Sequence, residues 1–259
     1  MQKTKQKSKL SAEETSRYSR QICMPDIGEK GQLKLTRSHV VIFGLGGLGS
    51  PASLYLTAAG IGKITLVDFD QVDDSNLQRQ IVHREKNIGQ DKVTSAKQNL
   101  SELNHRTILE TVHEKLNEQQ ANLLIEKADA VLDCTDNFAS RFALNRLCKQ
   151  HKVPLISGAA IRWEGQLTTY DFRLDNSPCY QCLYKQDDGK ELNCQSNGVL
   201  SPVVGLVGSM QAIEAIKALL DIKTLVGKLL IIDAYTMQFR PLNLKQDKNC
   251  PVCFHKIQS

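Results

Sequence analysis

Residues 38–68 decide the fold and read SHVVIFGLGGLGSPASLYLTAAGIGKITLVD. The apolar run at 38–43 predicts a buried strand, the glycine-rich residues 44–49 predict a turn, and the small residues 50–59 predict a helix. A second strand is expected over 63–68. A strand, a helix and a second strand within about 30 residues form a βαβ unit, and its parallel strands need helices on both faces of the sheet.

The alternation of helix and strand continues to about residue 157. Helical patterns are followed each time by a strand-like run, and the three pairs are 91–103 with 107–112, 118–127 with 130–133, and 138–150 with 154–157. Repeated pairs of this kind predict a doubly wound, Rossmann-like α/β sheet.

The pattern differs on either side of this region. Residues 11–37 have apolar positions at helical spacing, and the S-x-x-E pattern from Ser11 to Glu14 predicts a capping box that opens the first helix. Beyond residue 160 we expect, in order, a period-two strand, a polar loop with cysteines, a long helix and two closing strands, at 166–172, 179–198, 203–220, 229–233 and 236–242. The first half is therefore expected to be parallel and the second half α+β, with no clear linker between them.

Length and charge limit the possible classes of protein. With 259 residues and 41% apolar composition, the chain can bury one substantial core. We expect residues 1–10 to form a disordered basic tail and residues 11–259 to form a single domain. Four lysines in that tail supply most of the net charge of +5. The remaining body is nearly neutral, which argues against a nucleic-acid partner.

No signal peptide is expected at the N-terminus, and no apolar run approaches the roughly 18 residues of a membrane span. We therefore expect a cytoplasmic protein with no membrane partner. Cys179-x-x-Cys182 and Cys250-x-x-Cys253 are two C-x-x-C pairs, which in a reducing compartment typically hold metal. Together they can supply a tetrahedral zinc site with four cysteine ligands, although 67 residues separate the pairs.

The turn after the first strand carries the pattern G-x-G-x-x-G, formed by Gly44, Gly46 and Gly49 with Gly47 between them. Such a turn lets the backbone approach a phosphate, whose charge is met by amides at the helix N-terminus. Asp68 lies 19 residues after Gly49, where a carboxylate that binds ribose hydroxyls is expected. The pattern predicts nucleotide binding; the alternative is a glycine turn that only packs the helix on the strand.

The next polar residues favour ATP over NAD. Asn76, Arg79, Gln80 and then Lys92 follow the ribose carboxylate, and amides and cations there suit a triphosphate. Attack of a carboxylate on an α-phosphate develops negative charge, so catalysis needs positioned Arg, Lys and Mg²⁺ more than a general base. The alternative is that Arg79 and Lys92 belong to a solvated surface.

Asp136 lies where an apolar strand meets a helix, in the run Asp133-Cys-Thr-Asp136-Asn137 at the carboxyl edge of the predicted sheet. Ligands bind at that edge in open α/β folds. Two interpretations remain open. Asp136 either caps the helix N-terminus or binds Mg²⁺ on the triphosphate.

Five runs together resemble the HesA/MoeB/ThiF family, relatives of the ubiquitin-activating enzymes. They are Arg17-Tyr-Ser-Arg20-Gln21, Gly44-Leu-Gly-Gly-Leu-Gly49, Ser75-Asn-Leu-Gln-Arg-Gln80, Asp133-Cys-Thr-Asp-Asn137 and the two C-x-x-C pairs. The resemblance covers about residues 11–255. It implies ATP·Mg²⁺-dependent adenylylation of the Gly-Gly carboxyl terminus of a ubiquitin-like sulfur-carrier protein by a homodimer that releases pyrophosphate.

The resemblance also implies roles for single residues. Asp68 would bind ribose, Gly47 would contact the phosphates, and Asp136 would bind Mg²⁺. The triphosphate would be held by Asn76, Arg79 and Lys92. Arg20 would reach the active site of the neighbouring subunit, as an arginine finger does, on an N-terminal helix that swaps across the dimer. The zinc site would be structural, joining the C-terminal tail to the loop after residue 178.

The remaining cysteines are interpreted separately. Cys194 lies in a polar stretch near the predicted site, where an exposed thiolate can act as a nucleophile. The family contains members that use a cysteine at this place in sulfur transfer and members in which it is dispensable, so its role stays open. Cys23, Cys134 and Cys148 lie beside apolar residues and are expected to be buried.

Two other classes of function remain as alternatives: an NAD-dependent oxidoreductase, and a noncatalytic scaffold that binds a ubiquitin-like protein. The pathway also stays open. Residues 157–162 and 68–70 are more similar to activators of molybdopterin synthase, whereas residues 193–194 and 198–205 are more similar to enzymes of thiamine-thiazole biosynthesis. No fused rhodanese domain is expected within this sequence, so sulfur would come from a donor protein of desulfurase or rhodanese type.

Overall fold

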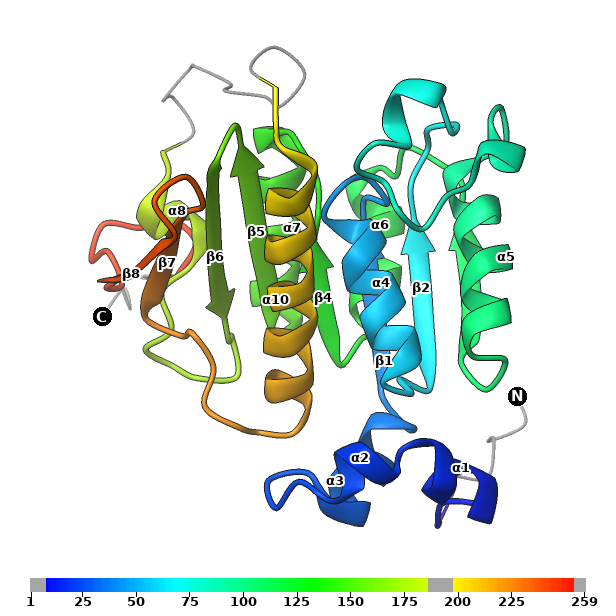
Figure 1. The fold of residues 1–259 in the computed structure, drawn as a ribbon. Coiled ribbons are helices and arrows are strands. Elements are labelled where there is room, and N and C mark those ends of the chain that lie inside the picture. The colour runs from blue at the N-terminus through cyan, green and yellow to red at the C-terminus, as the bar shows by residue number, and fades with distance from the viewer. Residues whose placement is uncertain (1–7, 186–197, 254–259) are drawn as a thin grey trace.

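The eight strands found among the described residues form one mixed sheet, shown in the computed structural model of Figure 1. The structure describes residues 8–185 and 198–253. The strand order across the sheet is β3-β2-β1-β4-β5-β6-β7-β8. The bounds are β1 (His39–Phe43), β2 (Lys63–Val67), β3 (Ile108–Val112), β4 (Ala130–Asp133), β5 (Leu155–Ile161), β6 (Glu164–Tyr170), β7 (Lys228–Asp233) and β8 (Gln238–Asn243).

The sheet changes character at β5. Strands β3, β2, β1, β4 and β5 are parallel, whereas β5, β6, β7 and β8 pair antiparallel. The predicted α/β class, with a parallel first half and an α+β second half, is therefore confirmed. The strand order reverses between β1 and β4, so the loops after these two strands leave the sheet side by side. Ligands bind at such a switch point in open α/β sheets.

Helices cover both faces of the sheet. Helices α4 (Gly49–Ala58), α5 (Lys92–Leu103) and α10 (Ser201–Leu219) lie in front in Figure 1, and α6 (Glu118–Ile125) and α7 (Phe138–His151) lie behind. Each face of the sheet has its own apolar core. The central parallel strands are buried on both faces, so apolar side chains from each strand point into both cores. Among the described residues, α10 alone has the length and composition to cross a membrane, and 56% of its most apolar 18-residue window is buried, as in the central helix of a globular core.

Three short helices, α1 (Ala12–Arg17), α2 (Ser19–Ile22) and α3 (Gly28–Leu35), lie at the amino ends of the parallel strands (Figure 1). They are fixed to the ends of α4 and α5: the Tyr18 hydroxyl accepts a hydrogen bond from Asn104, and the Gln21 amide donates to the Ala59 carbonyl at 3.1 Å. At Gly60, which has φ +84°, a Cβ would lie 2.4 Å from the Tyr18 ring. The N-terminal helices therefore dock tightly on their own chain.

Most element boundaries agree with the sequence prediction to within two residues, and the Ser11 capping box is present. Three details differ. The region 11–37 is divided into three helices, β5 extends to Ile161, and Leu10 in the expected tail is 6% exposed. The strand is longer because β5 pairs with β6 along its whole length. Residues 1–7 of the predicted tail lie outside the described residues.

Candidate functional site

The glycine-rich loop joins β1 to α4, as predicted. Gly44 has φ +92°, and a Cβ on it would lie 2.6 Å from the Cys134 carbonyl oxygen. A Cβ on Gly49 would lie 1.9 Å from the Gly44 carbonyl oxygen. Both positions therefore require glycine. The contact with Cys134 also shows that the loop after β1 touches the loop after β4.

Asp68 binds the glycine-rich loop directly. Its Oδ2 accepts a hydrogen bond from the Leu45 amide at 2.7 Å, and its Oδ1 accepts one from the Asp70 amide at 2.9 Å. Burial raises the pKa of Asp68, and the charge of Lys92 and the two amides oppose that shift. The glycine-rich loop and the carboxylate at the end of β2 are therefore one structural unit, as their spacing in the sequence indicated.

Lys92 is the first residue of α5 and points into this region. Its Nζ lies 2.8 Å from Asp70 Oδ2, and its side chain is only 7% exposed. The alternative that Lys92 belongs to a solvated surface is therefore wrong, because the helix N-terminus tucks under the loop after β2. Arg79 is half-buried and donates from Nη1 to the Ser75 carbonyl at 3.1 Å. Asn76 ends the 3₁₀ helix η1 (Asp74–Asn76), and its Oδ1 accepts from the Asp73 amide.

Beside the glycine-rich loop lie an open space at Gly46 and an unpaired side-chain oxygen of Gln80. Gln80 is 4% exposed, and its Oε1 is buried with no hydrogen-bond partner in the described part of the chain. A Cβ on Gly46 would lie 3.8 Å from Gln80 Nε2 and meet no other described atom within 4 Å. The space at Gly46 and the cation of Lys92 fit a bound phosphate. The unpaired Gln80 oxygen is an acceptor, so it suits a hydroxyl group or a water molecule beside the phosphate.

The structure of the loop after β4 distinguishes the two interpretations of Asp136, a helix cap or a Mg²⁺ ligand. The residue that caps α7 is Asn137, whose Oδ1 accepts from the Ser140 amide at 2.9 Å. Asp136 is exposed, and its Oδ1 lies 3.5 Å from Asn137 Nδ2. The capping interpretation of Asp136 is therefore wrong. Its carboxylate faces solvent at the carboxyl edge of the sheet, where an oxygen ligand suits Mg²⁺.

Buried polar groups hold that loop in place. Asp133 accepts from the Thr135 hydroxyl at 2.7 Å and from the Ser157 hydroxyl at 3.2 Å. The Arg141 guanidinium donates to the carbonyls of Thr135 at 2.6 Å and Gly158 at 3.1 Å. The backbone that carries Asp136 is thus fixed from both sides.

Arg20 is not part of this arrangement within one chain. It is exposed on α2, and α2 lies at the amino edge of the sheet (Figure 1). The glycine-rich loop follows β1, Asp136 follows β4 and Lys92 begins α5, so these groups lie at the carboxyl edge. The two edges are separated by the length of the parallel strands. Only a second subunit could therefore bring Arg20 next to a nucleotide at the carboxyl edge, and the predicted helix swap stays a prediction.

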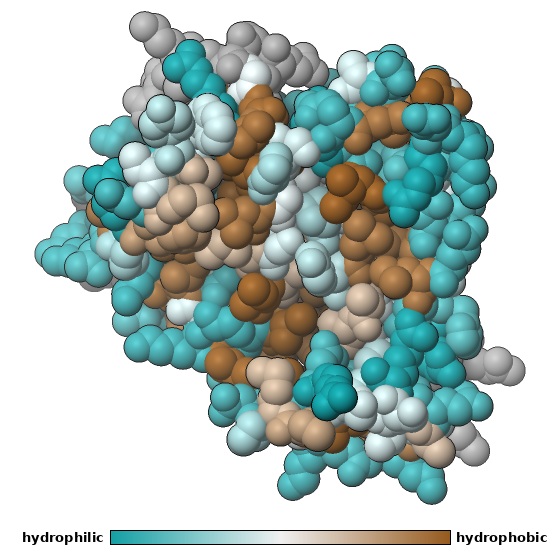
Figure 2. All heavy atoms as spheres, viewed as in Figure 1, coloured by the Kyte–Doolittle hydropathy of each residue, from teal (hydrophilic) through white to brown (hydrophobic). Residues whose placement is uncertain are grey.

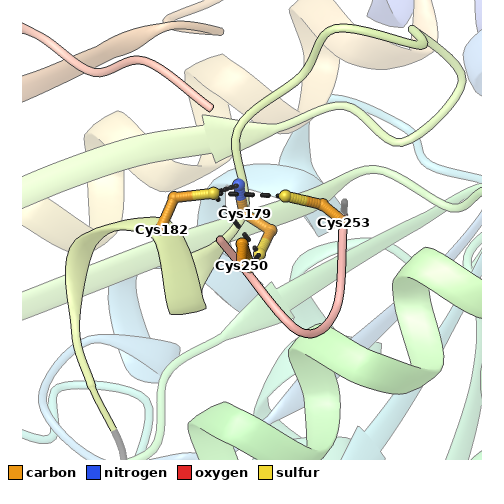
Figure 3. Close-up of side chains that lie close together, drawn as sticks. All are labelled: Cys179, Cys182, Cys250 and Cys253. Carbon is orange, nitrogen blue, oxygen red and sulfur yellow. Dashed lines mark hydrogen bonds between the residues drawn. The ribbon is translucent and has the colours of Figure 1, made fainter. Parts of the chain in front are cut away.

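The four C-x-x-C cysteines converge on one point, as Figure 3 shows. Cys179 directly precedes the single-turn helix α8 (Tyr180–Leu183), and Cys182 lies within it. Cys250 and Cys253 come from the C-terminal segment. All four sulfur atoms lie within 4.8 Å of one another. The sulfur of Cys179 lies 3.5 Å from that of Cys250, and the sulfur of Cys182 lies 3.2 Å from that of Cys253.

This geometry fits zinc. Sulfur atoms at about 2.3 Å from a tetrahedral zinc lie about 3.8 Å apart, close to the observed spacing. Backbone amides point at one of the thiols: Asp247 donates to Cys182 Sγ at 3.3 Å, and Cys179 donates to the same sulfur at 3.4 Å. The hydrogen bond between the Cys179 and Cys182 sulfurs and these two amides lower the pKa of Cys182, which favours the thiolate that a metal requires.

The other cysteines divide into two groups. Cys134 and Cys148 are buried, as expected, and burial raises the pKa of both thiols. Cys23 is exposed, so the expectation for it is wrong. It directly follows the single-turn helix α2, and no residue of α2 is buried. Cys194 lies outside the described residues.

Sequence reasoning left two residues of this region without a role. Asp70 pairs with Lys92, and His83 is buried with its ring Nε2 3.3 Å from the Leu45 carbonyl oxygen. A signal for Asp70 existed, because it lies inside the polar run that follows β2. For His83 there was none, because a lone histidine three residues after that run has no distinctive spacing.

Comparison with known proteins gives the same family by two routes. A model of the ThiF family matches residues 18–252. The molybdopterin-synthase adenylyltransferase of Escherichia coli (strain K12) is 46% identical over 95% of this chain and 99% of its own length. That of Haemophilus influenzae is 48% identical over 91% of this chain and 97% of its own. The adenylyltransferase and sulfurtransferase MOCS3 of Anopheles gambiae is 44% identical, and the chain spans only 56% of it.

Solved structures support the fold. A crystal structure of E. coli MccB with MccA-N7isoASN has a TM-score of 0.75 at 25% identity, and covers 86% of this chain and 69% of that one. A crystal structure of PaaA has a TM-score of 0.79 at 23% identity, and covers 95% of this chain and 78% of that one. With a family model that covers most of its length and relatives near half identity, this chain belongs to the ThiF family.

Proposed function

We propose that the protein uses ATP to adenylylate the C-terminal Gly-Gly carboxylate of a ubiquitin-like sulfur-carrier protein. The observation that carries the proposal is the meeting of the glycine-rich loop, the buried Lys92 and the unpaired Gln80 amide at the switch point of the sheet. The names of the near full-length relatives from E. coli and H. influenzae support it.

The reaction joins two anions, so the protein must neutralise charge. A terminal carboxylate oxygen of the carrier attacks the α-phosphorus of ATP, the bond to the bridging oxygen breaks, and pyrophosphate leaves with that electron pair. Charge grows on the phosphoryl oxygens and the leaving group. Asn76, Arg79 and Lys92 would hold the triphosphate, with Asp68 on the ribose and Gly44, Gly46, Gly47 and Gly49 giving close access to the phosphates.

Lys92 is well prepared for this role. It lies at a helix N-terminus and is screened from water, and both features strengthen its attraction for a phosphate. Asp70 holds the ammonium in place, and its carboxylate offsets part of that charge. Asp136 would hold Mg²⁺, which when bound neutralises phosphate charge. No proton needs to move in this step, so the reaction requires no general base.

We propose a homodimer in which Arg20 completes the partner's site. In Figure 2 apolar surface gathers over α10 and α4, on the face shown. Tyr55 of α4 is 59% exposed and Ile213 of α10 is 56% exposed. Large exposed apolar side chains on neighbouring helices favour a protein interface there. The opposite location of Arg20 in its own chain supports a role in trans.

The cysteine cluster would hold a structural zinc ion, because all four ligands are protein thiols and no position is left for a substrate. Zinc would tie the C-terminal segment to α8. A covalent role for Cys194, the single folded domain over 11–259 and a cytoplasmic location stay predictions.

The carrier of molybdopterin biosynthesis is the favoured substrate, because the near full-length relatives carry the name molybdopterin-synthase adenylyltransferase. The thiamine-thiazole carrier is the alternative. Sulfur would be supplied by a separate protein of desulfurase or rhodanese type.

A pyrophosphate–ATP exchange assay tests the proposal. Each of the two carriers, purified and ending in Gly-Gly, is supplied in turn as the substrate. We expect exchange that requires Mg²⁺ and the molybdopterin-type carrier, and no exchange with a carrier that lacks its last glycine. Exchange with the thiazole carrier alone would move the protein to that pathway. Hydride transfer from NADH would favour the oxidoreductase alternative, and carrier binding without exchange would favour a scaffold.

A further inference from the structure

His83 is a buried histidine that the proposed chemistry does not use. It follows the run that contains Asn76 and Gln80, and it is 3% exposed. Its ring lies between the glycine-rich loop and α5. Nε2 is 3.3 Å from the Leu45 carbonyl oxygen, and Nδ1 is 2.8 Å from Ser95 Oγ. His83 therefore contacts two of the elements that would bind the triphosphate.

The partners of the ring determine its tautomer. A carbonyl oxygen can only accept a hydrogen bond, so Nε2 of His83 must carry the proton that it donates to Leu45. Nδ1 is then the acceptor, and the Ser95 hydroxyl must donate to it. Burial lowers the pKa of His83 to about 4, so the ring is neutral at neutral pH and holds this one arrangement.

The hydrogen bonds at Leu45 fix the direction of its neighbouring peptides. The Leu45 amide donates to Asp68, and the Leu45 carbonyl accepts from His83 and, at 3.3 Å, from the Ser50 hydroxyl. In a planar trans peptide the C=O and the next N–H point in opposite directions. The Gly46 amide therefore points away from His83, and Gly46 is the position where a Cβ would meet open space beside Gln80.

Ser95 links the same histidine to the lysine. It lies three residues after Lys92 on α5, so the hydroxyl and the lysine share one face of the first helical turn. A change at His83 would thus shift the loop and the N-terminus of α5 relative to each other.

We propose that His83 is a positioning residue for the nucleotide. It turns the Gly46 amide toward the phosphate site and sets the distance between the glycine-rich loop and Lys92. The inference rests on the proposed function, because it assumes that a phosphate binds at this loop. In this role His83 holds the Gly46 amide in place and does not itself contact ATP.

Three variants test the proposal: His83→Leu, His83→Gln and Ser95→Ala. The leucine removes both hydrogen bonds, whereas the glutamine amide can still donate to the Leu45 carbonyl. ATP·Mg²⁺ affinity is measured by calorimetry, and KM for ATP and for the carrier by pyrophosphate exchange, at a temperature where thermal melts show every variant folded. We expect His83→Leu to weaken ATP binding about tenfold with little change in KM for the carrier.

The conservative variants distinguish positioning from general stability. His83→Gln should recover most of the ATP affinity, and Ser95→Ala should fall between the two. ATP affinity equal to wild type in His83→Leu would overturn the proposal, as would a glutamine variant as weak as the leucine variant. Wild-type protein that binds no ATP would instead refute the proposed function, and the inference with it.

Discussion

The carboxyl edge of the parallel strands and the cysteine cluster are two sites built by opposite means. At the edge, neighbouring βα loops supply backbone amides and buried charges, and packed strands and helices hold each group. At the cluster, two segments about 70 residues apart meet through four thiols. The first site is rigid because the core beneath it is rigid. At the second site, zinc would add a cross-link to the apolar packing of Leu244 and Val252 on the core.

This difference predicts a separation of roles. Removing a group at the edge should lower activity and leave the fold nearly unchanged, since the core does not depend on it. Removing a thiol from the cluster should do the reverse. The following changes test that separation, beginning with the largest effect.

Loss of zinc should cause the largest change in stability. Cys250 is 1% exposed within the cluster. We expect Cys250→Ser to lose the metal and to lower the free energy of unfolding by at least about 3 kcal/mol, because metal binding contributes directly to folding. Metal analysis by mass spectrometry and urea unfolding measure both effects, and ATP affinity at low temperature should stay within about twofold.

The exposed Cys23 gives the matched control. Cys23→Ser should keep one zinc per chain and unfold like the wild type. A wild-type chain purified without zinc, or Cys250→Ser unfolding at the same urea concentration as Cys23→Ser, would show that the cluster does not cross-link the protein.

The sequence was most informative where function depends on local order. The glycine pattern, Asp68 and Lys92 lie within 49 residues, and the βαβ pattern was enough to place them at one edge. The two cysteine pairs were found from their C-x-x-C spacing, which in a reducing environment typically indicates a metal site, and the family resemblance joined them in one structural site. That the two pairs lie together depends on how β7, β8 and the C-terminal segment pack, which spacing does not encode.

Loss of the proposed trans arginine should affect activity and not stability. Arg20→Ala and Asp136→Ala are each expected to lower the exchange rate about 10²- to 10³-fold, as removal of a charge-stabilising group does. Both residues are exposed, so unfolding should change by less than about 0.5 kcal/mol. When the two variants are mixed and subunits exchange, about a quarter of the wild-type activity should return, because one site in each mixed dimer is complete.

A second mixture provides the control. Arg79 and Asp136 are proposed to act in the same subunit's site, so mixing Arg79→Ala with Asp136→Ala should restore nothing. If Arg20→Ala with Asp136→Ala also restores nothing, although mixed dimers are present by mass, Arg20 does not act in trans.

Prediction from the sequence was wrong or incomplete where a residue's role depends on contacts with distant parts of the chain. Cys23 was expected to be buried because its sequence neighbours are apolar, yet α2 is too short to be covered. Asp136 was considered as a cap of α7, whereas the structure gives that role to the next residue, Asn137. The role of His83 depends on a loop 38 positions earlier in the chain.

The smallest expected effect is a change of stability with pH that arises from His83. Burial, chiefly, and the charges of Lys92 and Arg84 lower its pKa from 6.5 to about 4. Between these values the unfolded chain binds a proton that the folded chain does not, so the free energy of unfolding rises with pH. The stabilisation is fully present above about pH 6.5 and is lost as pH falls toward 4. From pH 7 to pH 5 the wild type should lose about 2 kcal/mol more than His83→Gln, measured by urea unfolding. Parallel curves for the two proteins would mean that His83 titrates as an ordinary exposed histidine, and the close packing of this ring between the glycine-rich loop and α5 would then be wrong.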